Sequence, residues 1–235
     1  MRVSALYIYP VKGCRAVPVE SSAVNGLGLE NDRRFAFMAE DGLAFTQRDQ
    51  PLLATVAPQV DADVLRLDLG GLAEMVVPLS SFTEHACVDV WGKTLAARAA
   101  PSMREVNDYL GATLRLVMLD GAAQRSFADS RPVLVTTSAM LARLGLPEIG
   151  MERFRPNVVL EGDGKWRMLR GEHVLLEYSE PCGRCEVTMI DQASGERRGP
   201  EPLRSLNERF AGNFGEYYGV VRPGRLRLGE EVVAA

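Results

Sequence analysis

Short runs of strand-forming residues, separated by glycine and proline, most limit what this 235-residue chain can fold into. Glycine and proline number 22 and 13, which is slightly more than common usage and favours many turns. Residues 64–69 alternate apolar and polar side chains, as a strand with one buried and one wet face does. The chain is therefore predicted to be mainly β, with a few helices.

Three hairpins are expected from the turn residues. Asp41-Gly42 lies between β-rich runs at 34–38 and 43–46, and this dipeptide suits a tight hairpin turn. Gly70-Gly71 separates residues 64–69 from an apolar run at 75–77. The last hairpin is expected to pair residues 220–221 with residues 226–228.

Three helices are also expected. Ser102 opens a capping-box sequence, so the first helix is predicted to begin there. The second is predicted to start near Thr137 or Ser138 and to end at Gly145. Pro202 suits the first turn of the third helix, which carries apolar side chains in helical phase.

Composition and charge exclude several classes of protein. Acidic residues number 31 and basic residues 27, a net charge of −4 that argues against a nucleic-acid binder. Apolar residues make up 46 % and charged residues 25 %, as in folded globular proteins. No run approaches the ~18 consecutive apolar residues of a membrane span, and the apolar start at residues 1–10 is shorter than expected for a signal or transit segment. The expected location is cytoplasmic, without a membrane.

The most unusual motif is Cys-x-x-Cys, formed by Cys182 and Cys185. A thioredoxin-like redox pair needs a βαβ context, but residues 174–178 and 187–190 are predicted to be antiparallel strands. A zinc site needs four ligands, and no second such motif exists. The remaining interpretations are a buried structural pair and a single reactive or metal-binding thiolate beside Arg184. Chemistry alone leaves all four interpretations open.

Two further motifs combine anion-binding groups. Arg155 and Asn157 precede an apolar strand at 158–160 and offer a guanidinium fork and a carboxamide. Lys12-Gly13 follows the first strand, where a glycine turn and an ammonium could hold an anion. More basic residues lie near strand ends at Arg33, Arg34 and Arg48. A local anion pocket and a solvated charged rim are both compatible with this pattern.

The order of these motifs along the chain resembles the MOSC family, named for the C-terminal domain of molybdenum cofactor sulfurase. The resemblance rests on Tyr9-Pro10-Val11-Lys12, Asp32-Arg33-Arg34-Phe35, Thr46-Gln47-Arg48, Phe154-Arg155-Pro156-Asn157 and Pro181-Cys182-Gly183-Arg184-Cys185. It implies an N-terminal MOSC β-barrel-like module at residues 1–119 and a MOSC module, similar to the pyruvate-kinase β-barrel, at residues 120–235. Within the family, the chain is most similar to the amidoxime-reducing group.

The resemblance also implies a molybdenum cofactor, Mo-molybdopterin, and roles for particular residues. Cys185 would be the catalytic residue and the metal ligand, with Cys182 only supporting it. The pterin and its phosphate would be held by residues matching the family pattern: Lys12, Gly13, Arg34, Thr137, Ser138, Arg155, Asn157 and Gly183. A soft thiolate suits a thiophilic metal that is already held by sulfur.

The function implied is the reduction of N-hydroxylated or N-oxygenated small molecules. The Cys spacing of a plant-type [2Fe–2S] domain is absent, so electrons are expected from a separate electron-transfer protein. The alternative is a molybdenum cofactor carrier, or a sulfur-transfer module with a persulfide on Cys185, without reductase turnover.

Overall fold

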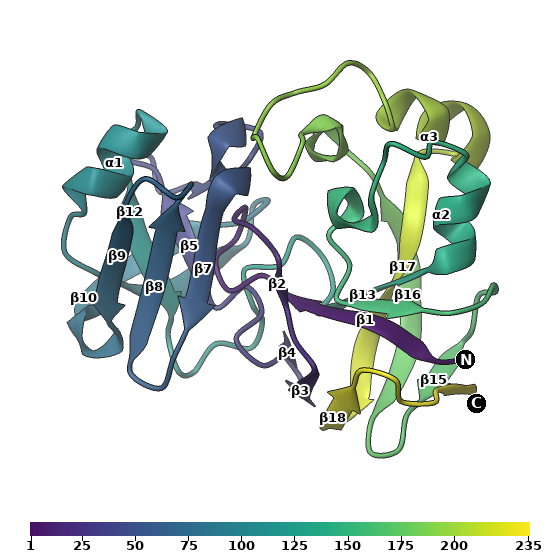
Figure 1. The fold of residues 1–235 in the computed structure, drawn as a ribbon. Helices are drawn as coiled ribbons and strands as arrows, with labels where there is room; N and C mark the ends of the chain where they lie inside the picture. Colours follow the sequence, from purple (N-terminus) through teal and green to yellow (C-terminus); the bar gives the residue numbers. More distant parts are fainter.

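The computed structural model describes residues 1–235 and confirms a mainly β chain with three short α-helices. Its largest sheet has eight strands in the spatial order β19-β15-β16-β17-β13-β14-β1-β2. In chain order these strands are β1 (Val3–Ile8), β2 (Val17–Pro18), β13 (Val133–Thr137), β14 (Val158–Leu160), β15 (Met168–Arg170), β16 (Leu175–Gly183), β17 (Asn213–Arg222) and β19 (Val233–Ala234). This sheet forms the right-hand half of the molecule in Figure 1.

The other half is built from a five-stranded and a three-stranded sheet. The first contains β5 (Phe35–Met38), β6 (Ala44–Phe45), β10 (Glu84–Asp89), β11 (Thr94–Ala99) and β12 (Arg115–Leu119). The second contains β7 (Val56–Val60), β8 (Val64–Leu69) and β9 (Glu74–Pro78). Their facing side chains enclose the largest apolar core, a cluster of 17 buried residues that includes Phe35, Phe37 and Leu67.

A third small sheet ties the two ends of the chain together. It contains β3 (Ser21–Asn25), β4 (Gly28–Leu29) and β18 (Gly224–Arg227), with Leu226 opposite Ser22. Leu226 and Val24 belong to one buried cluster with the large sheet. Strands β1, β3 and β4 therefore pack with the C-terminal half, and Figure 1 shows β1 running into that half. Strand pairing thus crosses the sequence boundary predicted at 119/120.

Two of the expected hairpins are confirmed and one is wrong. Phe37 pairs with Phe45 across β5 and β6, and Leu67 pairs with Met75 across β8 and β9. The expected pairing of 220–221 with 226–228 does not form, because β17 pairs with β13 and β16 while β18 pairs with β3. Pro223 separates the two strands, and Leu226 is buried on the other side of that turn.

The helices are α1 (Arg104–Leu110), α2 (Ser138–Leu144) and α3 (Leu203–Phe210). The capping box at Ser102 is wrong: Met103 is the N-cap of α1 and offers no side-chain hydrogen bond. Thr137 does cap α2, accepting a hydrogen bond from Met140 N, and Gly145 ends it with a φ of 68°. No helix has the length and apolar character needed to cross a bilayer.

Short 3₁₀ turns complete the chain at Pro51–Thr55, Leu79–Ser81, Met151–Phe154 and Glu186–Met189. The last of these stands where a strand was expected at 187–190, so that expectation is wrong. Cys185 is its N-cap, and Thr188 donates to the carbonyl of Cys185 at 2.9 Å. The hydroxyl thereby closes a tight turn directly after the Cys-x-x-Cys motif and keeps the chain from continuing as a strand.

Candidate functional site

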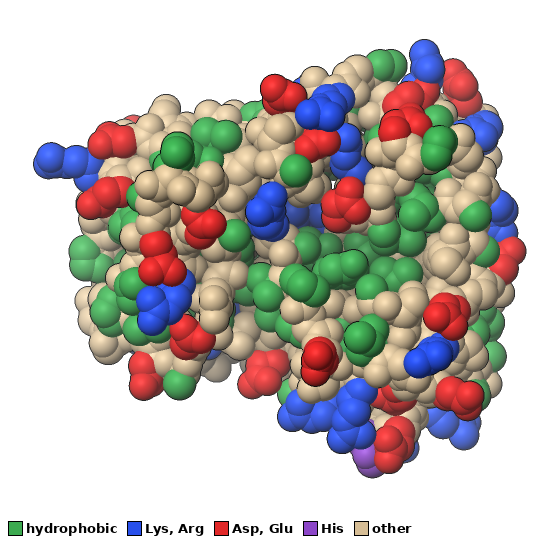
Figure 2. Space-filling model, in the orientation of Figure 1, with side chains coloured by type: hydrophobic (Ala, Val, Ile, Leu, Met, Phe, Trp, Pro, Cys, Tyr) green, Lys and Arg blue, Asp and Glu red, His purple; other side chains and the backbone are tan.

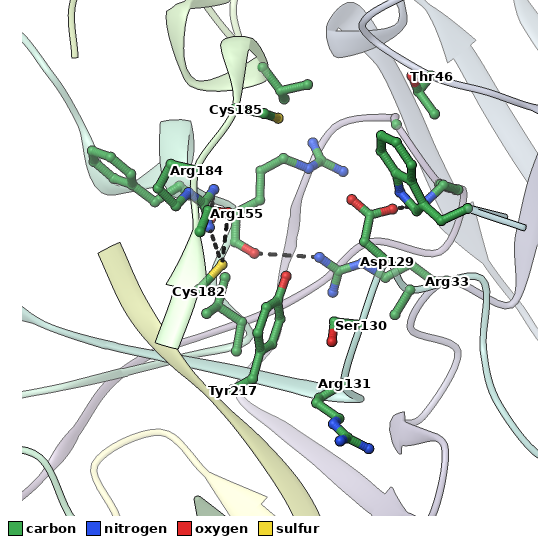
Figure 3. A pocket seen from close by; sticks show the side chains of 18 of the residues that line it. Arg33, Thr46, Asp129, Ser130, Arg131, Arg155, Cys182, Arg184, Cys185 and Tyr217 are labelled. Carbon is green, nitrogen blue, oxygen red and sulfur yellow. Dashed lines mark hydrogen bonds and ion pairs between the residues drawn. The ribbon is translucent and has the colours of Figure 1, made fainter. Parts of the chain in front are cut away.

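A cavity of about 510 Å³ lies where the two halves meet. Its walls come from the segment after β1, the loop after β6, the β10–β11 turn, residues 128–131, the turn before β14 and the end of β16. Figure 3 shows these side chains converging from separate elements. A space of this size suits a small molecule or an organic cofactor.

The charge of the cavity is opposite to that of the chain. Among the lining residues, the acids are Asp129 and Glu180, and the bases are Lys12, Arg33, Arg48, Arg131, Arg155 and Arg184. Acidic and basic side chains are mixed over the face shown in Figure 2. The excess of bases is therefore a local feature, as expected for a site that binds an anionic ligand.

Two of the lining arginines, Arg33 and Arg155, pack on the ring of a fully buried tyrosine, Tyr9, behind the cavity wall. The guanidinium carbons of Arg33 and Arg155 lie 4.4 and 4.3 Å from the centroid of Tyr9. Both arginines have left-handed backbone, with φ of 47° and 53°, a strained conformation that clusters at functional sites. Burial raises the pKa of Tyr9 and lowers the pKa of Arg155 to about 10, so Arg155 stays charged at neutral pH.

Asp32 and Asn157 hold Arg33 in place. The buried Asp32 carboxylate accepts from Arg33 at 2.6 Å and from the backbone N–H of Tyr9 at 2.8 Å. Burial raises the pKa of Asp32, and Arg33 opposes that rise. Asn157 Oδ1 accepts from Arg33 at 3.2 Å and from Leu134 N at 3.1 Å. Asn157 is thus a positioning residue, because its side-chain oxygen already accepts two hydrogen bonds within the protein.

One wall carries an ion pair between the buried Lys12 and the partly exposed Asp129. Lys12 Nζ also donates to the carbonyl of Phe127 at 2.9 Å. Burial alone would raise the pKa of Asp129, but the charges of Lys12 and Arg48 hold it well below its usual range. Asp129 is therefore a fixed carboxylate at neutral pH that orients both bases.

The two cysteines of the motif lie in different environments. Cys182, in β16, is only 1 % exposed, and its Sγ accepts from Arg184 Nη1 at 2.8 Å. Cys185 is half-buried on the cavity wall, and its Sγ accepts from Arg48 Nη2 at 3.0 Å. β16 contains irregular register between Pro181 and Gly183, and such bulges re-aim side chains beside functional sites. Cys185 is therefore the thiol that a bound ligand can reach.

The donor set fits an anionic cofactor that brings a thiophilic metal. No group of three or more His, Cys, Asp or Glu side chains could hold a metal ion by itself, which disfavours the zinc interpretation. A metal at Cys185 would need its other ligands from a non-protein molecule. The buried Nε of Arg184 lacks a partner, while its other nitrogens bind Cys182 Sγ and the carbonyl of Phe154. This unused donor suits an additional acceptor in the cavity.

The structure brings together six of the sequence-predicted site residues. They are Lys12, Gly13, Arg155, Asn157, Gly183 and Cys185. Arg34, Thr137 and Ser138 do not line the cavity. Arg34 donates to Asn31 and Met118, because its neighbour Arg33 takes the cavity side of the chain. Thr137 is occupied as the N-cap of α2, and Ser138 is exposed at the start of that helix.

Sequence reasoning missed Trp91, Asp129 and Tyr217, which also line the cavity. The Tyr217 hydroxyl points into the cavity in Figure 3, and burial and Cys182 raise its pKa, so it stays a neutral donor. Asp129 begins the polar run Asp129-Ser130-Arg131, which precedes an apolar strand. Arg155 was selected on the same signal, a polar residue shortly before an apolar strand. Trp91 lies in a hairpin turn, where the sequence offered no pattern.

Thiol reactivity should follow this geometry. In the folded apo protein at about pH 8, we expect iodoacetamide to label the exposed Cys87 first and the half-buried Cys185 next. Burial raises the pKa of Cys14 to about 12, although Arg155 opposes the rise, so Cys14 should stay unlabelled. Cys182 should also be protected. Peptide mass spectrometry against time gives the order, and denatured protein, in which all four thiols react, is the control. Labelling of Cys14 or Cys182 before Cys87 would contradict the structure.

These features define a two-part β protein that presents one half-buried thiol to a cationic cavity. Two family models together match almost the whole chain. The MOSC N-terminal beta barrel domain matches residues 1–119, and the MOSC domain matches residues 122–233. The chain therefore belongs to the MOSC family.

Curated proteins with related sequences share both parts. Mitochondrial amidoxime reducing component 2 of Bos taurus is 29 % identical over 98 % of this chain and 82 % of its own length. Mitochondrial amidoxime-reducing component 1 of Homo sapiens is 25 % identical over 98 % of this chain and 82 % of its own length. Molybdenum cofactor sulfurase of Drosophila grimshawi is 29 % identical over 90 % of this chain, but that match covers only 31 % of the sulfurase.

Proposed function

We propose that this chain binds a molybdenum cofactor in the cavity and reduces N-hydroxylated or N-oxygenated small molecules, with electrons from a separate protein. The observation that carries the proposal is the half-buried Cys185 thiol on the wall of a cavity lined by six basic residues. The similarity to amidoxime reducing components over 98 % of the chain supports this reaction class. The cytoplasmic location stays a prediction.

Each part of the cavity wall suits a different part of the cofactor. Cys185 would bind the molybdenum, since a thiolate suits a soft metal site. Lys12, Arg155 and Arg184 would hold the phosphate and pterin oxygens through charge-assisted hydrogen bonds. At Gly13, with φ of 83°, and Gly183 the wall is bare backbone, so main-chain groups can approach a flat ligand closely. When bound, the cofactor supplies the two-electron redox chemistry.

The protein's own side chains prepare the site for an N–O substrate. Reduction of R–NHOH takes up two electrons and two protons and releases R–NH₂ and water. Arg48 fixes the Cys185 sulfur by its 3.0 Å hydrogen bond, and the ionised Asp129 in turn orients Arg48. The neutral Tyr217 hydroxyl can donate a hydrogen bond to the departing oxygen.

The reductase assignment is tested by turnover. Molybdenum-loaded protein with a chemical one-electron donor should convert benzamidoxime to benzamidine, measured by chromatography. Protein from a molybdenum-free culture is the control, and it should give no product above the donor alone. Absence of turnover in fully loaded protein would contradict the reductase proposal.

The second candidate is cofactor handling without turnover, as a carrier or as a persulfide-bearing sulfur-transfer module. The similarity to molybdenum cofactor sulfurase over 90 % of this chain favours it. Loaded protein that fails to reduce benzamidoxime, but restores a cofactor-free molybdenum enzyme when mixed with it, would support the carrier. Mass spectrometry that finds an extra sulfur on Cys185 would support the sulfur-transfer module.

A further inference from the structure

Trp91 occupies a turn position that its side chain does not suit. Val90 and Lys93 exchange backbone hydrogen bonds of 3.0 and 3.3 Å, so Trp91 and Gly92 form a two-residue hairpin turn between β10 and β11. Both central residues have positive φ, 57° at Trp91 and 74° at Gly92, as in a type I′ turn. Asn, Asp and Gly are preferred at the first of these positions, and a bulky residue is strained there.

Packing in the core does not explain this strain, because Trp91 is 62 % exposed. Its ring nevertheless lines the cavity. The indole also helps to lower the pKa of Asp129. A strained residue at a ligand cavity, with little burial to stabilise it, points to a role in binding.

The contacts of Arg48 place the indole close to the reactive sulfur. The Arg48 guanidinium carbon lies 4.7 Å from the centroid of the Trp91 ring, and its Nη2 donates to Cys185 Sγ at 3.0 Å. One arginine side chain therefore spans the space between the ring and the thiol. Arg48 covers part of the indole, and the large exposed fraction leaves another surface of the ring open to a ligand.

We propose that Trp91 is a specificity-determining residue, whose open indole surface stacks on the planar, conjugated part of the substrate. The inference rests on the proposed reductase function and narrows its substrate class. N-hydroxylated groups attached to a flat aromatic ring can stack on Trp91 while their N–O bond points toward Cys185. Substrates with the same group on a saturated ring lose the stacking contact.

Binding without turnover tests this role directly. Molybdenum-loaded, oxidised protein without an electron donor is titrated with benzamidoxime and with cyclohexanecarboxamidoxime, and the dissociation constants are measured by calorimetry. The wild type should bind the aromatic probe about tenfold more tightly, as one aromatic stacking contact allows. Trp91→Asn should weaken the aromatic probe about tenfold and the saturated probe less than about twofold. Trp91→Phe should keep most of the preference.

The variants are chosen so that misfolding cannot imitate the result. Asn suits the turn better than Trp, so Trp91→Asn should unfold at the same temperature as the wild type or higher. Leu72→Asn is the matched control, because Leu72 is 82 % exposed in another hairpin turn; it should change neither constant.

Three outcomes would overturn the inference, and molybdenum content separates a failure of the proposed function from a failure of the role of Trp91. An unchanged aromatic preference in molybdenum-loaded Trp91→Asn overturns the role of Trp91 and leaves the proposed function standing. Equal weakening of both probes overturns it as well, since a general loss of binding is not stacking. Wild-type protein that takes up no molybdenum overturns the proposed function, and this inference with it.

Discussion

Replacing Cys185 by serine is expected to remove most of the molybdenum from the purified protein. Its Sγ is the only half-buried thiol on the cavity wall, and a serine oxygen is a poor ligand for a soft metal site. Molybdenum measured by plasma mass spectrometry should fall at least about tenfold relative to wild type. The fold should be retained, because the Cys185 side chain faces the cavity and not a core.

Cys182→Ser is the matched control for this loss. Cys182 is 1 % exposed and its sulfur already accepts a hydrogen bond from Arg184 at 2.8 Å. A serine oxygen can accept the same bond, so molybdenum content should stay within about twofold of the wild type. If Cys185→Ser keeps its molybdenum and Cys182→Ser loses it, the metal ligand is Cys182 and the assignment is wrong.

Replacing Asp32 by alanine should cause the largest loss of stability at the site. The change removes the closer acceptor of Arg33 Nη1 and the acceptor of the Tyr9 N–H, and leaves a largely buried guanidinium without its counter-charge. Breaking a buried ion pair from one side costs about 3–5 kcal/mol. Urea unfolding of the apo protein should show a decrease of that size in the free energy of unfolding.

Two further variants separate burial from charge in this effect. Asp32→Asn keeps the shape and one acceptor oxygen, so its loss should be smaller than that of Asp32→Ala. Asp163 pairs with Arg143 on the surface, where both side chains are about half exposed, and Asp163→Ala should change stability by less than about 1 kcal/mol. An Asp32→Ala protein as stable as Asp163→Ala would refute the role of this ion pair.

Local elements of the fold were predictable because their signals are local. The turn residues Asp41-Gly42 and Gly70-Gly71 lie between the strands they join, and both hairpins form. Pairings between distant segments were not predictable by such reasoning. Tyr7 and Asn157 share a hydrogen bond across 150 residues, and nothing near either residue indicates its partner. The pairing expected for residues 226–228 was wrong for the same reason, since β18 pairs with β3, which lies near the other end of the chain.

Site residues were predictable only where they stand in recognisable sequence motifs. Lys12, Arg155 and Cys185 stand in recognisable patterns, and all three line the cavity. Arg33 and Arg34 are neighbours, and a shift of one residue exchanges which side chain faces the cavity. The sequence therefore could not choose between them, and the structure places Arg33, not the predicted Arg34, on the cavity wall. Arg48 and Cys185 meet although they are 137 residues apart, which only the fold reveals.

The proposed function requires this cavity to hold a molybdenum cofactor through Cys185. The most direct measurement is the metal and pterin content of the wild-type protein, purified without chelators from a molybdenum-replete host. Molybdenum by plasma mass spectrometry and pterin by fluorescence after oxidation should both be present and equimolar with the protein. Protein that contains neither, or that contains stoichiometric zinc in place of molybdenum, would contradict the claim.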